Sequence, residues 1–365
     1  MAFDGITIAA MVSELNKNLS GGRINKIAQP ENDELLITGK GTNGQKRLLL
    51  SASASLPLIY FTAKNRISPL TAPNFCMLLR KHIGSARITA IRQPGLERVV
   101  EFELEHLNEL GDVCHKLLIM ELMGKHSNII FCDDKGMILD SIKHVSCNVS
   151  SVREVLPGRP YFIPHTQDKL DPLTISKEDF IEKVCGRSNA ISKALYQTLT
   201  GLSPVMAQEI CYRAQVDGND DSQSLSQAAM ERIYTEFSNI TEQIRREEFT
   251  PVIIFKDNEP VEYGVLPLSQ YGEGFTAQTF ESVSEMLETY SASRDVITRI
   301  RQKSADLRKI VQTALDRNRK KLQLQQKQMK DTEKKDKYKI YGELINAYGY
   351  GLEDGCKAFK AVNYY

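Results

Sequence analysis

One arginine stands out because it follows a turn and enters a run of alternating apolar and acidic residues, QPGLERVVEFELE (93–105). From Val100 the pattern has a period of two, which predicts a strand with apolar side chains on one face and glutamates on the other. Arg98 falls in phase with the apolar face, directly after Glu97 and a Pro-Gly turn. Such a guanidinium either extends past the rim of the core to reach water or is held in place to bind a ligand.

A second stretch, ELMGKHSNII (121–130), sets Glu, Lys, His, Ser and Asn side by side. Catalytic groups must converge through space, whereas neighbouring residues of a strand connection point to opposite faces. Gly124 can take a positive φ, and Ser127 or Asn128 can bond nearby backbone, so the stretch is typical of a bulge or turn. We therefore expect no catalytic residue here, and either a purely structural turn or a shaped binding edge.

Known catalytic and metal patterns are missing from the sequence. It contains no phosphate-binding loop, dinucleotide fingerprint, zinc-protease helix or serine-hydrolase elbow. The seven cysteines and six histidines are dispersed and never spaced as CxxC, which argues against a zinc site and predicts reduced thiols. The pair Asp133-Asp134 precedes Lys-Gly and fits a hairpin turn better than a metal site. We expect no metal, no cofactor and no enzymatic activity.

The composition is that of a globular protein with two or three domains: 365 residues, of which 41% are hydrophobic and 25% charged. The first twenty residues carry charges, and no later apolar run approaches the length that a membrane span needs. We therefore expect a cytoplasmic protein without membrane contact.

The net charge of +1 hides a strongly basic segment, because residues 291–341 hold 16 Lys and Arg against 6 Asp and Glu. Such a block indicates either a nucleic-acid contact or the solvated face of a long helix. The segment 293–341 lacks Pro and Gly, which predicts one very long helix. Its thin apolar seam needs a partner helix, and we infer that the returning helix belongs to a longer protein. The seam consists of Ile297, Ile300, Leu307, Val311, Ala314, Leu315, Leu322 and Met329.

The helices and strands that must position these residues can be predicted from the sequence. Together they indicate an α+β fold rich in antiparallel sheet. A helix over 4–19, capped by Asp4, opens the first domain (1–175), and a second helix covers 74–82. The remainder of this domain reads as strands. These cover residues 23–29, 34–39, 46–51, 58–62, 88–92, 98–107, 115–122, 128–132 and 137–144.

Residues 176–245 are helical and contain ISKALYQTLTGLSPVMAQEICYRA (191–214), which looks like a helix-hairpin-helix with Pro204 in the first turn of its second helix. That unit can hold a phosphate at a helix start, although two short helices joined by a turn also occur without a ligand. Residues 246–291 predict a strand hairpin and a helix that pack back on the first domain, so that the helical unit is an insertion.

Four motifs in this order resemble the RqcH/NEMF family, also called NFACT proteins: NFCMLLRKHI (74–83), QPGLERVVEF (93–102), ELMGKHSNII (121–130) and PGRPYFIP (157–164). The resemblance covers essentially the whole chain. It implies an NFACT-N domain, a helix-hairpin-helix domain and, over 292–365, the truncated first arm of an antiparallel coiled coil.

The resemblance also implies a function. Members of the family bind large ribosomal subunits that are obstructed by peptidyl-tRNA of a stalled nascent chain. They recruit further tRNA, expected to be alanyl-tRNA, for template-free C-terminal tailing, while the ribosome performs peptidyl transfer. The implied partners are therefore the large ribosomal subunit with its rRNA, tRNA and peptidyl-tRNA.

The family's acidic residue and arginine that engage tRNA correspond to Glu97 and Arg98 here, with Glu in place of the more common Asp. By the same resemblance, further candidates for the tRNA-binding surface are Glu121, Lys125, His126 and Asn128. An arginine at a strand end can present fork-like donors to phosphate or a base edge.

Two other functions compete with this interpretation. Bacterial members are often labelled fibronectin-binding protein A, which suggests a surface adhesin, but no signal peptide is visible and fibronectin binding would be secondary. The first domains also resemble formamidopyrimidine-DNA glycosylases, which act through an N-terminal proline amine and a glutamate. This chain begins with Met1-Ala2-Phe3-Asp4, so that nucleophile is missing.

Overall fold

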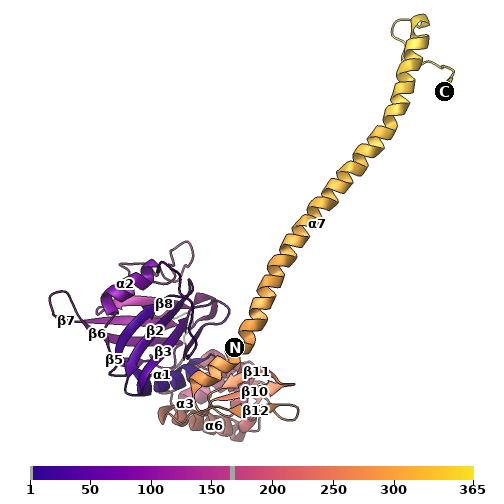
Figure 1. The fold of residues 1–365 in the computed structure, drawn as a ribbon. Coiled ribbons are helices and arrows are strands. Elements are labelled where there is room, and N and C mark those ends of the chain that lie inside the picture. The colour runs from indigo at the N-terminus through magenta and orange to yellow at the C-terminus, as the bar shows by residue number, and fades with distance from the viewer. Residues whose placement is uncertain (1–2, 165–168) are drawn as a thin grey trace. The chain divides into compact units, whose positions relative to one another are not determined.

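The computed structural model describes residues 3–164 and 169–365, with the side chains of 293–303, 305 and 306 outside the description (Figure 1). The chain divides into two compact units, Met1–Ser293 and Arg294–Tyr365. Each unit is described by itself.

Helix α1 (Gly5–Leu19) opens the first unit and begins where the sequence predicts it. The backbone N–H of Thr7 donates to the Asp4 carboxylate at 2.9 Å, which confirms Asp4 as the N-cap. Ile8, Met11 and Leu15 lie on one face and are fully buried, so α1 is anchored by apolar packing.

A nine-stranded sheet forms the centre of this unit, with the order β4-β3-β2-β1-β5-β6-β7-β8-β9 (Figure 1). All of its pairings are antiparallel, which confirms the predicted α+β class. The strands are β1 (Arg23–Ala28), β2 (Glu34–Gly41), β3 (Gly44–Ser51), β4 (Leu58–Phe61), β5 (Arg87–Arg92), β6 (Val99–Leu107), β7 (Val113–Glu121), β8 (Asn128–Asp133) and β9 (Ile138–Ser141). Helix α2 (Asn74–Ile83) buries Phe75 and Leu79 in the main core.

The helical region and a small second sheet complete the first unit. Its helices are α3 (Lys177–Phe180), η2 (Ile181–Cys185), α4 (Ile191–Thr198), α5 (Pro204–Arg213), η3 (Ser222–Ser224) and α6 (Gln227–Arg245). The second sheet, in the order β11-β10-β12, contains β10 (Val252–Lys256), β11 (Glu259–Gly264) and β12 (Thr276–Thr279). The sequence did not predict β12, because its four residues are exposed and carry no alternating pattern. Ile253 and Val265 share the main core with Ile6 of α1.

Two apolar clusters cover the two faces of the large sheet at β6, β7 and β8. Val100 and Met120 belong to the main core, whereas their neighbours Val99 and Ile119 belong to a smaller second cluster. Successive residues of a strand point to opposite faces, so the two clusters lie on opposite sides of the sheet. Residues 143–163, here called the strap, supply Val145, Val155, Tyr161 and Ile163 to the second cluster.

Helix α7 (Val283–Tyr348) contains the whole segment predicted as one long helix, and η4 (Gly349–Gly351) follows it. In the second unit, the described residues of the predicted apolar seam are exposed, for example Leu307, Val311 and Met329. Ile297 and Ile300 lie outside the described side chains. Within the part of the chain that the structure describes, no helix has the length and hydropathy needed to cross a membrane.

Candidate nucleic-acid interface

A pocket of about 420 Å³ is lined in part by the strap, and four of the six candidate residues, Arg98, Lys125, His126 and Asn128, also line it. Its cationic and histidine side chains are Arg98, Lys125, His126, Lys143, His144 and Arg153. Its apolar side chains are Met123, Val145, Val149, Val152, Val155 and Pro164. Among the described residues that line it none is acidic. The pocket is therefore suited to a ligand that combines negative charge with an apolar or aromatic body.

Arg98 reaches this pocket from the loop 93–98, which we call the first wall. It is exposed and lies one residue before β6, so the prediction that it is one of the first strand residues was wrong by that residue. Arg98 lies in a bend, and its carbonyl oxygen already accepts a hydrogen bond from Leu122 N at 2.9 Å. Arg98 is thus exposed at a cationic hollow and does not cover the core, and its binding of a ligand stays a prediction.

The first wall is fastened through backbone contacts. Gln93 Nε2 donates to Gly5 O and to Glu97 O, both at 2.9 Å. A Cβ on Gly5 would lie 2.1 Å from Leu96 O, and one on Gly201 would lie 2.4 Å from the same oxygen. The start of α1 and the turn after α4 thus hold the loop at distances that only glycine permits.

Glu97 is partly buried and is not among the pocket residues. No ion pair joins Glu97 to Arg98 among the described residues, so Glu97 does not hold the Arg98 guanidinium through a direct contact. Both residues lie near Lys169, whose pKa is lowered by burial and by Arg98, while Glu97 acts in the opposite direction. The Lys169 ammonium donates to Tyr196 O at 2.8 Å.

Lys125 and His126 are exposed on η1 (Gly124–His126), a single turn between β7 and β8. Gly124 has φ 61°, and Ser127 N donates to Gly124 O at 3.0 Å, which confirms the predicted turn. The structure therefore brings Arg98, Lys125 and His126 together at one pocket.

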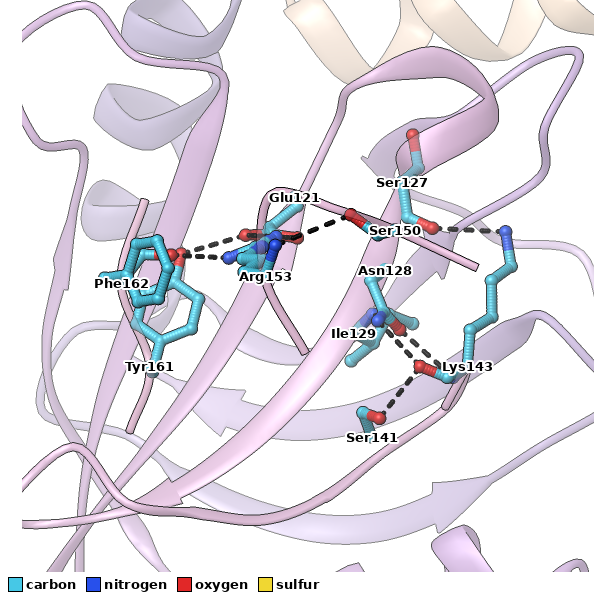
Figure 2. A network of polar contacts seen from close by, with 10 residues as sticks. All are labelled: Glu121, Ser127, Asn128, Ile129, Ser141, Lys143, Ser150, Arg153, Tyr161 and Phe162. Carbon is cyan, nitrogen blue, oxygen red and sulfur yellow. Dashed lines mark hydrogen bonds and ion pairs between the residues drawn. The ribbon is translucent and has the colours of Figure 1, made fainter. Parts of the chain in front are cut away.

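Asn128 is also at the pocket, but its amide is engaged in the fold. It is 2% exposed, and its Nδ2 donates to Lys143 O at 2.8 Å. Its Oδ1 accepts from Lys143 N at 3.1 Å and from Ile129 N at 2.9 Å (Figure 2). Asn128 thus joins β8 to the start of the strap, and its predicted contact with tRNA stays a prediction.

Lys143 is a pocket residue that sequence reasoning missed. Its ammonium donates to Ser127 O at 3.1 Å and to Ala52 O, and burial lowers its pKa. Since an ammonium has three donors, one remains for a ligand. No pattern in the sequence marks this residue, because its partners lie far away along the chain.

Glu121 is fully buried at the end of β7 and cannot present its carboxylate at the surface. Arg153 Nη2 donates to Glu121 Oε1 at 2.6 Å and Oε2 at 2.5 Å, and Tyr161 OH donates to Oε1 at 3.1 Å (Figure 2). Burial raises the pKa of Glu121, whereas the bonds from Arg153 and Tyr161 act to lower it. Any effect of Glu121 on a ligand must pass through Arg153, which the sequence analysis also missed.

Helices α4 and α5 and their turn are present, with Ser203 as N-cap and Pro204 in the first turn. Their turn is packed against Gly5 and Leu96. The buried Asp4 carboxyl is hydrogen-bonded to Ser203, and burial raises its pKa. A carboxyl at this helix start disfavours an anion, so phosphate binding by this turn stays a prediction without support from the geometry.

These features agree with comparisons to known proteins. The protein family described as NFACT N-terminal and middle domains matches residues 4–365. The chain therefore belongs to this family, as the four motifs predicted.

Among the curated relatives, the "Rqc2 homolog RqcH" of Bacillus subtilis is 34% identical over 368 residues, and that of Streptococcus suis is 31% identical over 366. Both matches cover 100% of this chain but only 62% and 61% of the relatives, so the chain spans about three fifths of their length. The mouse "Ribosome quality control complex subunit NEMF" is 24% identical over 217 residues, which is 60% of this chain and 19% of the mouse protein.

Two solved structures share the fold. The N-terminal part of the fibronectin/fibrinogen-binding protein from Streptococcus suis has a TM-score of 0.66 and 32% identity, covering 80% of this chain and 99% of that one. The fibrinogen binding protein from Staphylococcus aureus has a TM-score of 0.67 and 27% identity, covering 79% and 98%.

Proposed function

We propose that the chain is the tRNA-recruiting part of a ribosome-associated quality control factor. In this proposal it binds obstructed large ribosomal subunits in the cytoplasm and supplies tRNA for C-terminal tailing of stalled chains. The observation that carries the proposal is the pocket in which Arg98, Lys125 and His126 of the family motifs converge. The names of the curated relatives, RqcH and NEMF, support the ribosomal context.

The chemistry of the pocket supports an RNA ligand. Arginine and lysine contact phosphate or base edges, and apolar walls accommodate an unstacked base, which is how proteins recognise single-stranded parts of RNA. The volume of about 420 Å³ falls within the range of small-ligand sites and is far too small for a duplex. A single nucleotide from a loop or end of tRNA therefore fits this proposal.

The second unit supports a contact with ribosomal RNA. The basic segment 291–341 lies in α7, and its described Lys and Arg side chains beyond residue 306, such as Lys320 and Lys321, are exposed. Lysines and arginines along a helix can neutralise several phosphates, so binding to subunits should weaken steeply with salt.

No catalytic role is part of the proposal, because the ribosome would perform the peptidyl transfer. The described residues contain no cluster of three or more His, Cys, Asp or Glu side chains that could hold a metal ion. The chain would bind and position RNA, and it would need no cofactor.

An adhesin is the second candidate, because the two similar solved structures carry fibronectin- or fibrinogen-binding names. The cationic pocket gives no specific support to that function. Finding the protein on the cell surface, and away from large subunits in sucrose gradients, would favour it.

The test is co-purification of tRNA and large subunits with the full-length protein, comparing wild type with Glu97→Ala/Arg98→Ala. We expect the bound tRNA to fall about tenfold or more, because a charge-assisted hydrogen bond contributes about 1.5–3 kcal/mol. Large subunits should remain bound through the basic segment. Arg92→Ala is the matched control, since Arg92 pairs with Glu103 at 3.1 Å outside the pocket. Unchanged tRNA in the double variant would overturn the proposal.

A further inference from the structure

The loop 146–154 forms the second wall of the pocket. It lies outside the family motifs that supply Arg98 and Lys125. The base of this loop is closed by Val145 and Val155, whose backbones exchange hydrogen bonds of 3.1 and 2.8 Å. The loop lines the pocket with Val149, Ser150, Val152 and Arg153.

Apolar burial does little to hold this loop in place. Val149 is 74% exposed and Val152 is 53% exposed, so neither side chain is anchored in a core. The turn within the loop is local, because Ser146 O accepts from Val149 N at 2.9 Å and from Ser150 N at 3.1 Å. A polar interaction must therefore fix the loop relative to the sheet.

Arg153 supplies that interaction, and its side chain is only 10% exposed. Its guanidinium binds both carboxylate oxygens of Glu121 and also donates to Phe162 O at 2.5 Å (Figure 2). It lies 5.6 Å from the ring centroid of Tyr161, whose hydroxyl bonds to the same carboxylate. One side chain thus joins the loop, the end of β7 and the far end of the strap.

We propose that Glu121 and Arg153 form a positioning pair that sets the second wall of the RNA pocket. Glu121 does not touch RNA; it holds Arg153, and with it the loop 146–154, in the position that closes the pocket. The inference rests on the proposed function, because the ligand is the tRNA proposed above. It gives a role to a motif glutamate that has no exposed surface.

The distribution of charge supports a role for Glu121 in holding Arg153 and not in contacting RNA. A carboxylate facing the pocket would repel phosphate, whereas the Glu121 carboxylate is compensated by Arg153 and shielded by burial. Positive charge for the ligand remains on Arg98, Lys125 and Lys143. Removing one partner leaves an uncompensated buried charge, while replacing both by apolar residues removes that penalty.

The experiment measures two quantities on the full-length protein: its affinity for fluorescently labelled bulk tRNA, and amide hydrogen exchange at Val145 and Val155. The variants are Arg153→Met, Glu121→Gln and the double variant Glu121→Met/Arg153→Met. We expect each single variant to weaken tRNA binding about tenfold and to speed exchange at both amides. The apolar double variant should restore slow exchange and bring affinity back to within about threefold of wild type.

Arg92→Met is the matched control, since Arg92 pairs with Glu103 at 3.1 Å, contacts no residue of the loop 146–154 in that pair and does not line the pocket. Both quantities should stay at their wild-type values in this variant. If Arg153→Met fails to fold, Glu121→Gln carries the test, because the amide keeps the size of the carboxylate.

Two results would overturn the positioning pair. Single variants with wild-type exchange and affinity would remove any positioning role, and a double variant with slow exchange but weak binding would show that Arg153 acts by touching RNA. Failure of the proposed function has a different signature: Arg98→Ala would leave tRNA affinity unchanged, whereas hydrogen exchange would still report whether Glu121 and Arg153 hold the loop.

Discussion

The two walls of the pocket are held by different physical means. The loop 93–98 is fixed by backbone packing, where Gly5 and Gly201 approach Leu96 so closely that no Cβ fits. The loop 146–154 is fixed by a buried ion pair between Arg153 and Glu121. Glycine packing cannot relax without moving the chain, whereas an ion pair can be broken by changing one side chain. The first wall is therefore a rigid reference, and the second wall is the adjustable one.

The electrostatics of the second wall strengthen the contrast. Burial raises the pKa of Glu121, so its surroundings disfavour the charged carboxylate more than its partners favour it. The hydrogen bonds that fasten the first wall involve no charged group, because they join neutral backbone carbonyls to the Gln93 amide. Variants that change one wall alone should therefore show how far the free energy of unfolding and the affinity for tRNA each depend on that wall.

The largest effect on the free energy of unfolding is expected from Gly201→Ala, which changes a residue packed against the first wall. Gly201 has φ 76°, and a Cβ there would lie 2.4 Å from Leu96 O, so the free energy of unfolding should fall by about 3 kcal/mol. Gly136→Ala is the matched control, because Gly136 has the same φ of 76° with nothing within 4 Å. Chemical denaturation measures both, and equal losses would show that the close approach to Leu96 has no energetic weight.

The same pair of variants tests the link to binding. Gly201→Ala displaces the loop that carries Arg98, so we expect weaker tRNA binding under conditions where the variant is still folded. Gly136→Ala should keep wild-type affinity. A displaced first wall with unchanged affinity would mean that Arg98 does not need its present position.

Much of the first wall could be predicted from the sequence, and little of the second. Pro-Gly before an alternating run marks the turn and strand that place Arg98, and Gly124 marks the turn that places Lys125. These are local signals, in which the residues that form each turn are neighbours. The close approach of Gly5 and Gly201 to Leu96, which holds the loop, joins residues far apart in the chain and was not predicted. The domain boundaries and the roles of the candidate residues in tRNA binding stay predictions.

The second wall depends on contacts between residues far apart in the chain. Glu121 meets Arg153 across 32 positions, and Lys143 meets Ala52 across 91. No periodicity or turn chemistry encodes such pairings, so Glu121 was expected at the RNA surface and Arg153 was not considered. A motif residue can thus lie buried behind a pocket instead of lining it.

A smaller effect is expected from Tyr161→Phe, which weakens the second wall and leaves the first untouched. The change removes the 3.1 Å hydrogen bond to Glu121 Oε1 but keeps the aromatic ring beside Arg153. The free energy of unfolding should fall by about 1.5 kcal/mol, because the lost bond is to a charged group. Exchange at the Val155 amide should rise, with tRNA affinity reduced less than in Arg153→Met.

Tyr196→Phe is the control for that variant, since the Tyr196 hydroxyl makes no hydrogen bond to the described residues and Tyr196 does not line the pocket. If Tyr161→Phe matched this control in both stability and exchange, the hydroxyl would have no part in holding Glu121.

The smallest effect is expected from Asp4→Asn, which probes the charge buried beside the first wall. Burial raises the folded-state pKa of Asp4 above its value in the unfolded chain, against the opposing bonds from Ser203 and Thr7. The folded protein therefore binds the extra proton more tightly, and the contribution of Asp4 is fully present below the unfolded pKa and declines as pH rises through the folded pKa. Asn caps a helix as well as Asp does and has no proton to lose, so the variant should be slightly more stable than wild type at neutral pH and equal to it in acid. Thermal unfolding of both proteins across this range measures the difference. A variant that is less stable at neutral pH would show that the ionised carboxylate stabilises the start of α1, and that the first wall, like the second, relies on charge.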